Sequence, residues 1–214
     1  MSDQSSQHRL YSRILQGLTV MLIRICFRPK VIYASEEARQ TAFSEPRVII
    51  YNHVRGMDAA VIYSMLRCPA TALSAQDLVA QYPILRLLYK VFPMLRIDRE
   101  HASLSWLRES RQLLRSGQHV MIAPEGKCSP ERVLLPFKPG CVMLAAASGT
   151  KILPIYHNGE YHYLFGRRFR MIVGEPIAVT PSPDGLRPDE MNREAELLHD
   201  AMLALAEQLD SPAL

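Results

Sequence analysis

The sequence predicts a single α/β domain with a central, largely parallel mixed sheet flanked by helices. Short apolar runs rich in β-branched residues alternate along the chain with segments whose apolar residues recur at helical spacing. Strands that alternate with helices normally pair in parallel, and this pattern defines the α/β class. The length of 214 residues suits one domain with a substantial core, and 48% apolar with 21% charged residues is ordinary for a globular protein.

Residues 1–28 are expected to form an N-terminal amphipathic helix ahead of an α/β domain at 29–214, with helical periodicity over 8–27 and Pro29 as its end. At about 100° per residue, its apolar side chains share one face and its arginines an adjoining arc. The face comprises Leu10, Ile14, Leu18, Met21, Leu22 and Ile25, and the arc comprises Arg9, Arg13, Arg24 and Arg28. The uncharged stretch 14–23 is too short to span a bilayer. This pattern fits a helix lying in a membrane interface, and packing on the core is the alternative.

The first elements of the α/β domain follow from local pattern. Residues 31–34 are expected to form a short strand and residues 35–46 a polar loop. Residues 48–51 are a run of bulky side chains ended by Asn, which predicts a buried strand running into a turn. Residues 58–67 have helical periodicity, and residues 70–74 are the next expected strand.

Residues 78–95 predict a helix, and its segment 82–92 is very apolar, with Arg86 and Lys90 one turn apart. Cationic side chains can reach water while their stems lie along apolar surface, so this segment could rest on the same bilayer as residues 8–27. A helix buried in the core is an equally good interpretation at this length.

The rest of the chain continues the alternation of strands and helices. Helical periodicity covers residues 101–116, 141–148 and 189–209. Strands are expected at 119–123, 151–156 and 169–173, after a strand edge at 96–97. The connections are a long loop at 124–139, an Asn-Gly hairpin turn at 158–159 and a Pro-rich linker at 180–188.

Charge and cysteine content exclude some classes of protein. The net charge of +4 hides an asymmetry, because residues 1–30 are mostly basic and residues 184–214 mostly acidic. That distribution argues against a nucleic-acid-binding domain with an overall basic face. The four cysteines form no Cys-x-x-Cys pair and no secretory cleavage signal is seen, so a reducing compartment is expected. His157 and His162 flank the Asn-Gly turn instead of sharing a helix, so no metal site is predicted.

His53 and Asp58 lie in the loop after the strand at 48–51, and α/β sheets usually carry their chemistry at such strand ends. They are five residues apart, and Gly56 allows a sharp turn, so the carboxylate can reach one nitrogen of the imidazole. That contact would fix the tautomer and stabilise the imidazolium once His53 takes a proton. A substrate hydroxyl can then be the nucleophile. The alternative is an ordinary loop histidine, with Asp58 capping a helix.

Two further loops follow strand ends and carry charge. Asp98 and Arg99 follow the strand edge at 96–97, and Glu125-Gly126-Lys127 follows the strand at 119–123. If the sheet is parallel, all three loops lie at one edge. A His–Asp pair beside cations suits an anionic substrate, and Arg99 could bind a phosphate through its planar guanidinium. A surface salt bridge from Arg99 to Asp98 or Glu100 is the alternative.

Four sequence blocks, in order, make the chain resemble the glycerolipid acyltransferase family, which includes the 1-acylglycerol-3-phosphate and lysophospholipid acyltransferases. The blocks are Asn52-His53-x4-Asp58, Ile97-Asp98-Arg99, Pro124-Glu125-Gly126 with Phe137-Lys138-Pro139-Gly140, and Ile152-Leu153-Pro154-Ile155. Gly174-Glu175-Pro176-Ile177 also recurs in that family. Each block alone is weak evidence, but the ordered set is highly specific and spans residues 52–177.

Two of these blocks depart from the family pattern. The family usually has Glu-Gly-Thr-Arg-Ser where this chain has Glu125-Gly126-Lys127-Cys128-Ser129, so its phosphate-binding Arg is missing. Cys128 in that place resembles the lysophosphatidylcholine acyltransferase branch of the family. The first block usually has Ser or Thr two residues after its His, where this chain has Arg55. The family is therefore better defined by the sequence than the acceptor lipid is.

The resemblance implies transfer of a fatty acyl group from acyl-CoA or acyl carrier protein, as co-substrate, to the hydroxyl of a lysophospholipid, most simply 1-acylglycerol-3-phosphate. His53 would be the general base, and Asp58 would orient it. Arg99, Glu125 and Gly126 would position the acceptor head group. Lys127 or Arg55 would restore the positive charge lost with the Arg of the motif. The reaction needs no metal, organic cofactor or covalent intermediate.

Two alternatives remain open. Loss of the motif Arg favours acylation of a non-phosphate lysolipid, such as a lyso-aminolipid. A catalytically silent membrane-binding protein is the other, and the intact His53–Asp58 pair argues against it. The predicted place is the cytoplasmic face of the cell membrane, with peripheral or monotopic attachment. The expected partners are the lipid bilayer, the lysolipid acceptor and the acyl donor, and no nucleic acid.

Overall fold

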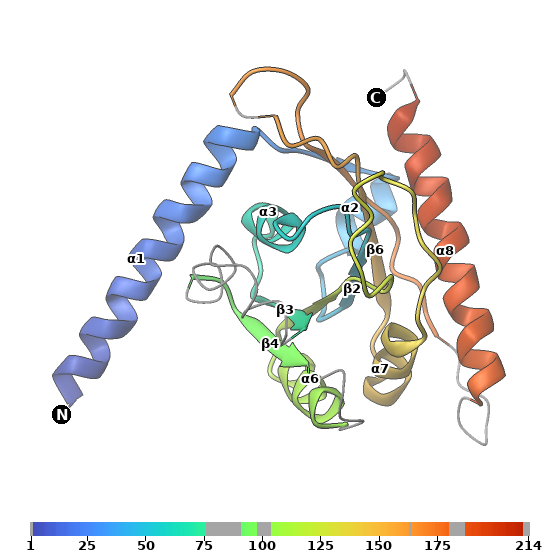
Figure 1. Cartoon of the computed structure of the whole chain (residues 1–214). Coiled ribbons are helices and arrows are strands. Elements are labelled where there is room, and N and C mark those ends of the chain that lie inside the picture. The colour runs from blue at the N-terminus through green and yellow to red at the C-terminus, as the bar shows by residue number, and fades with distance from the viewer. Residues whose placement is uncertain (1, 76–90, 98–103, 163, 180–186, 212–214) are drawn as a thin grey trace.

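A seven-stranded sheet in the order β1-β7-β6-β2-β5-β3-β4 forms the centre of the protein (Figure 1). The computed structural model describes residues 2–75, 91–97, 104–162, 164–179 and 187–211. The strands are β1 (Lys30–Tyr33), β2 (Val48–Tyr51), β3 (Ala70–Ala75), β4 (Met94–Ile97), β5 (His119–Ile122), β6 (Ile152–His157) and β7 (Arg170–Val173). Neighbouring strands pair in parallel except β6 and β7, which are antiparallel. The predicted mixed, largely parallel α/β domain is therefore confirmed.

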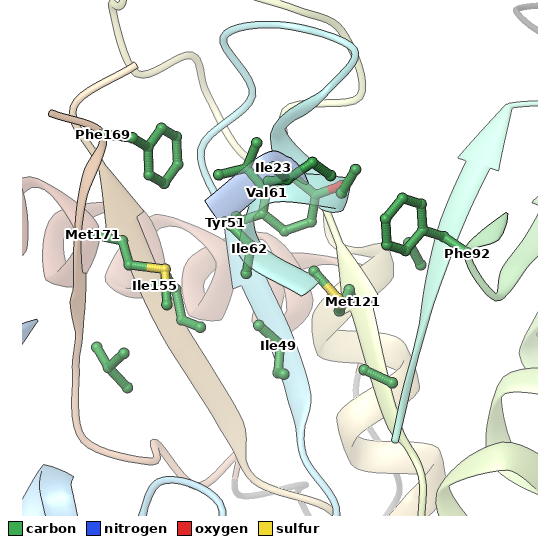
Figure 2. Close-up of a cluster of buried hydrophobic side chains, with 14 of the residues drawn as sticks. Ile23, Ile49, Tyr51, Val61, Ile62, Phe92, Met121, Ile155, Phe169 and Met171 are labelled. Atoms are coloured by element: carbon green, nitrogen blue, oxygen red, sulfur yellow. The ribbon is translucent and has the colours of Figure 1, made fainter. Parts of the chain in front are cut away.

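Helices cover both faces of the sheet. One face packs against α1 (Ser2–Phe27) and α3 (Asp58–Met65), and the other against α6 (Ser105–Arg115), α7 (Gly140–Ser148) and α8 (Pro188–Asp210). Successive residues of β2 serve the two layers. Ile49 and Tyr51 point into the core cluster on the face of α1 and α3 (Figure 2), and Val48 and Ile50 belong to the cluster on the face of α6, α7 and α8. A strand buried on both faces needs a continuous apolar run, which is what residues 48–51 provide.

The predicted loop at residues 35–46 contains a helix, α2 (Glu36–Thr41), so that prediction is wrong. Ser35 caps the helix, because its hydroxyl accepts a hydrogen bond from the backbone N–H of Ala38 at 3.0 Å. Glu36 and Glu37 lie in the first turn, where negative charge is favoured by the helix dipole. A serine followed by acidic residues is the start signal that the polar composition concealed.

The helix predicted for residues 78–95 is wrong at its end. Met94 and Leu95 belong to β4, which pairs in parallel with β3. The segment up to residue 90, with most of the proposed apolar stretch, lies outside the described residues. Val91 and Phe92 are buried in the core beside β3 and β4.

The connection between β6 and β7 is long, and the predicted tight hairpin turn at 158–159 is wrong. β6 ends at His157 and β7 begins at Arg170. Asn158 still organises the turn, because its side-chain oxygen accepts from the backbone N–H groups of Glu160 and Arg170 at 3.2 and 3.0 Å. The extra length carries Glu160 and Tyr161 to the carboxyl edge of the central strands.

α1 begins at Ser2 instead of residue 8, and its predicted apolar face points away from the domain between Ile14 and Ile25. Ile23 and Phe27 are only 5% and 3% exposed and lie in the core cluster beside α3. Arg24 ties α1 to α3 by donating to the backbone oxygen of Ser64 at 2.7 Å from Nε. In the part of the chain that the structure describes, no helix combines the length and apolarity needed to cross a membrane. The described residues of the predicted apolar face are at least half exposed, and they are Ile14, Leu18, Met21, Leu22 and Ile25.

That exposure overturns the alternative in which this apolar face packs on the core. The core contact is made by a different side of α1, to which Ile23 and Phe27 belong.

Candidate active site

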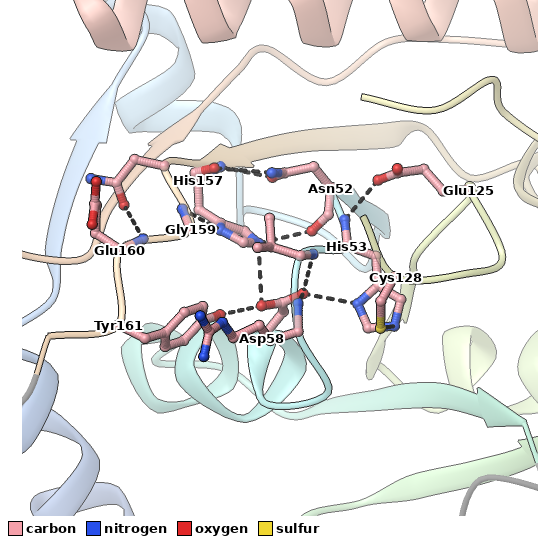
Figure 3. Close-up of polar contacts among 12 residues, drawn as sticks. Asn52, His53, Asp58, Glu125, Cys128, His157, Gly159, Glu160 and Tyr161 are labelled. Carbon is pink, nitrogen blue, oxygen red and sulfur yellow. Dashed lines mark hydrogen bonds and ion pairs between the residues drawn. The ribbon is translucent and has the colours of Figure 1, made fainter. Parts of the chain in front are cut away.

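His53 and Asp58 lie in contact at the carboxyl edge of the sheet (Figure 3). His53 follows β2 and Asp58 begins α3, and Nδ1 of the imidazole is 2.8 Å from Oδ2 of the carboxylate. The Asp58 side chain is fully buried, whereas that of His53 is 17% exposed. Because the carboxylate accepts the Nδ1 proton, Nε2 is the nitrogen left to exchange a proton with a substrate.

Four hydrogen bonds hold the Asp58 carboxylate. Besides His53, Oδ2 accepts from the backbone N–H groups of Val54 and Arg55 at 2.7 and 2.8 Å. The Tyr161 hydroxyl donates to Oδ1. Burial favours the neutral acid, but the hydrogen bond from His53, the positive charge of its protonated ring and the hydrogen bond from Tyr161 outweigh it, so the pKa of Asp58 lies below its ordinary value. Asp58 is therefore ionised and can stabilise a protonated His53.

The outward nitrogen of His53 contacts a thiol. Nε2 lies 3.2 Å from Sγ of Cys128, an exposed residue in the loop after β5. The backbone fixes this contact, because the Ser129 N–H donates to the His53 carbonyl at 2.6 Å. Burial alone would lower the pKa of His53, but the hydrogen bonds to Asp58 and Cys128 and the charges of both raise it to about 10.

Glu125 joins the His53 loop to the loop at 124–139. Its two carboxylate oxygens accept from the backbone N–H groups of His53 at 2.7 Å and Leu135 at 3.0 Å. Glu125 is buried, and burial raises its pKa. Gly126 then turns with φ of +70°, and a Cβ there would lie 2.9 Å from Nζ of Lys138. These hydrogen bonds and the packing beside Lys138 set the positions of Glu125 and Gly126 within the loop. That either residue touches an acceptor stays a prediction.

Asn52 and His157 join the carboxyl ends of β2 and β6. The Asn52 amide donates to the His157 carbonyl and accepts from the His157 N–H, both at 2.9 Å. Nδ1 of His157 accepts from the Gly159 N–H at 3.1 Å, so Nε2 carries the proton that is donated to the Asn52 carbonyl at 2.8 Å. Full burial holds the pKa of His157 below its ordinary value. This neutral imidazole supports the site and is not a second base.

The predicted acceptor-binding cations come from two loops. Arg55 is exposed, and its guanidinium carbon lies 5.7 Å from the centre of the Tyr161 ring. Lys127 is exposed beside Cys128. Arg99 lies outside the described residues, although the parallel pairing of β4 with β3 directs the carboxyl end of β4 to the same edge.

Sequence reasoning missed the roles of Tyr161, His157 and Cys128 at this site. Tyr161 is 103 residues from Asp58, and no local pattern joins them. Cys128 had a usable signal, since it replaces a motif residue next to the predicted catalytic histidine. His157 and His162, considered as a metal pair, have different partners. Both ring nitrogens of His157 contact backbone groups, whereas His162 Nε2 contacts Glu160 at 2.8 Å. Within the described residues, no group of three or more His, Cys, Asp or Glu side chains is arranged to hold a metal ion.

Comparison of the sequence with known proteins assigns the chain to a family. The family model described as Acyltransferase matches residues 30–158. The 1-acyl-sn-glycerol-3-phosphate acyltransferase of Limnanthes alba is 28% identical over 198 residues, which are 89% of this chain and 67% of that protein. Its namesake from Cocos nucifera is 28% identical over 203 residues, covering 88% and 63%, respectively. The namesake from Haemophilus influenzae is 27% identical over 173 residues, covering 76% and 69%. The chain thus spans about two thirds of the length of these relatives.

The fold also matches a solved structure. The crystal structure of the 1-acyl-sn-glycerophosphate acyltransferase PlsC from Thermotoga maritima superposes with a TM-score of 0.61 at 17% identity, covering 99% of this chain and 85% of that one. Fold and family match together define an enzyme that transfers acyl groups. The chain belongs to the Acyltransferase family and is of the glycerolipid acyltransferase type.

Proposed function

We propose that the enzyme transfers a fatty acyl group from an acyl thioester, either acyl-CoA or acyl carrier protein, to the free hydroxyl of 1-acylglycerol-3-phosphate. The observation that carries this proposal is the outward-facing Nε2 of His53, whose Nδ1 is held by Asp58 at 2.8 Å. The names of the curated relatives, which specify this acceptor for those proteins, support the choice.

In this proposal His53 takes the proton of the acceptor hydroxyl while the oxygen attacks the acyl carbonyl carbon. Asp58 stabilises the imidazolium that forms, and backbone N–H groups stabilise the oxyanion of the tetrahedral intermediate. When the intermediate collapses, the carbon–sulfur bond breaks and the departing sulfur takes the proton from His53. Such general acid–base catalysis contributes about 10²–10⁴-fold to the rate.

Lys127 is proposed to hold the acceptor phosphate, with Arg55 and Arg99 as further cations. Replacing it (Lys127→Ala) should lower kcat/KM for 1-acylglycerol-3-phosphate about ten- to a hundredfold, because losing a charge-assisted contact costs about 1.5–3 kcal/mol. A monoacylglycerol, which has no phosphate, should be affected far less. The measurement is turnover of a lysolipid panel by mass spectrometry. Lys151→Ala is the matched control, because this exposed lysine precedes β6 at the opposite edge of the sheet.

Equal effects of Lys127→Ala on the charged and the neutral acceptor would contradict the phosphate role. Efficient acylation of a lyso-aminolipid, with poor acylation of the phosphate acceptor, would favour the second acceptor class. Cys128 in place of the motif Arg is the observation behind that class.

The proposal includes attachment to the cytoplasmic face of the cell membrane through α1. Its support is the open apolar face of α1, with Leu18 at 54% and Leu22 at 58% exposed. Replacing both leucines by serine should weaken sedimentation with anionic vesicles at least about tenfold, since each buried leucine contributes about 1.5–3 kcal/mol. Thermal unfolding should barely change, because neither side chain lies in the core.

Leu197 and Leu203 of α8 are exposed by 54% and 41% and provide the matched control. Replacing that pair by serine should leave vesicle binding unchanged. Vesicle binding that survives the Leu18 and Leu22 substitutions would assign the attachment to another segment.

A further inference from the structure

Cys128, His53 and Asp58 form a chain of contacts with the geometry of nucleophile, base and orienting acid. Sγ of Cys128 is 3.2 Å from Nε2 of His53, and Nδ1 of the same ring is 2.8 Å from Asp58. A nucleophile within hydrogen-bond reach of a base that a third group orients is the arrangement found in enzymes with covalent catalysis.

The thiol is both held in place and open to a substrate. The hydrogen bond from the Ser129 N–H to the His53 carbonyl, at 2.6 Å, fixes the residue after Cys128 against the histidine. Glu125 fixes the other end of this short loop through the backbone N–H of His53 at 2.7 Å. Cys128 itself is exposed, so an acyl donor can approach Sγ from solvent.

We propose that Cys128 carries the acyl group as an enzyme-bound thioester between the donor and the acceptor. The inference rests on the proposed function, because the same His53 serves both halves of the reaction. It adds a step that the family resemblance alone does not require.

In the first half, Sγ of Cys128 attacks the carbonyl carbon of the acyl thioester, and His53 holds the thiol proton. The new carbon–Sγ bond forms, the bond to the donor sulfur breaks, and His53 passes the proton to that sulfur. One thioester is exchanged for another, with no oxidation or reduction. The step is therefore close to balanced in free energy and reversible.

In the second half, His53 takes the proton of the acceptor hydroxyl, whose oxygen attacks the acyl carbon on Cys128. The carbon–Sγ bond breaks as the ester forms, and the proton returns from His53 to Sγ. Acylation of the sulfur removes the contact and the charge that help to raise the pKa of His53. A larger fraction of the His53 imidazole is therefore neutral, and able to act as a base, at the stage where a hydroxyl must lose its proton.

The test is isotope exchange by the full chain without any acceptor. Palmitoyl-CoA is incubated with isotopically labelled free CoA, and labelled palmitoyl-CoA is measured by mass spectrometry. A parallel reaction uses palmitoyl carrier protein with labelled carrier protein. The wild type should exchange label, and Cys128→Ala should lower the exchange rate at least about a hundredfold. Cys128→Ser, which keeps the side-chain shape, serves with thermal unfolding to show that the fold persists.

Cys68→Ala is the matched control, since Cys68 is half-buried and precedes β3 at the opposite edge of the sheet from His53. This variant should exchange label like the wild type. After an acid quench, the wild type should carry an acyl mass on the peptide that contains Cys128, and neutral hydroxylamine should remove it. An adduct that is equally abundant on Cys68 would reveal nonspecific acylation and would count against the proposal.

The outcomes separate this inference from the proposed function. Acylation of a lysolipid without label exchange, or at an unchanged rate in Cys128→Ala, overturns the thioester and leaves the proposed function standing. Exchange that depends on Cys128 without acylation of any phosphate-bearing acceptor supports the thioester and overturns the proposed acceptor. Absence of exchange with both donors overturns the thioester whatever the acceptor panel shows.

Discussion

The His53→Ala variant is expected to keep its fold and to lose at least about 10²–10⁴-fold in kcat. Nε2 of His53 is the group that the proposed reaction uses to move a proton, and no other imidazole in the described site can replace it. His157 is fully buried with both ring nitrogens occupied by the backbone. The measurement is steady-state acylation of 1-acylglycerol-3-phosphate, with thermal unfolding to verify the fold.

His162→Ala is the control for this experiment, because His162 is 53% exposed and pairs with Glu160 instead of Asp58. It should retain nearly all turnover. A His53→Ala variant with near wild-type kcat on its best acceptor would remove both the general base and the Cys128 thioester from the mechanism.

Two substitutions of Asp58 are expected to separate catalysis from folding. Asp58→Asn keeps the shape and an acceptor oxygen for the backbone N–H groups of Val54 and Arg55, so the fold should persist. It removes the charge that stabilises a protonated His53 and allows the wrong tautomer, which should cost about 10³–10⁴-fold in kcat. Asp58→Ala leaves the buried donors without an acceptor and should lower the free energy of unfolding by about 3–5 kcal/mol.

Denaturant unfolding and steady-state kinetics of both variants make the comparison. We expect Asp58→Asn to unfold at nearly the denaturant concentration of the wild type but to have a low kcat, and Asp58→Ala to unfold at a lower denaturant concentration. An Asn variant with full activity would show that the carboxylate is only a structural hydrogen-bond acceptor, the alternative in which Asp58 merely organises the start of α3.

The parts of the fold that could be predicted are those that a pattern of apolar residues over a few neighbouring positions specifies. The four-residue apolar run of β2 and the regular apolar repeat of α8 show, within a few neighbouring residues, which side chains are buried. Both elements occur where the pattern places them. α2 was missed because its six residues are too few and too polar to show a periodicity. The first half of β4, Met94 and Leu95, was mistaken for the end of a helix because short apolar runs suit both structures, whereas the strand edge expected at 96–97 lies within β4.

The candidate site divides in the same way. The five-residue spacing of His53 and Asp58 makes their contact a local event, which the loop after β2 and the start of α3 can specify. Tyr161 reaches Asp58 only because the β6–β7 connection is long, and that length was hidden by an Asn-Gly pair typical of tight turns. The approach of Cys128 to His53 depends on the pairing of β2 with β5, a contact between residues 75 positions apart.

Attachment through α1 would also change which concentration of acceptor the enzyme responds to. α1 is joined to α3 by Arg24 and by Gln16, whose side chain donates to the Tyr63 hydroxyl at 3.1 Å, and α3 begins at Asp58. An enzyme held at the leaflet in this way meets its lysolipid by lateral diffusion. Its rate would follow the mole fraction of acceptor among the surrounding lipids, so inert lipid added at a constant total of acceptor would slow the reaction.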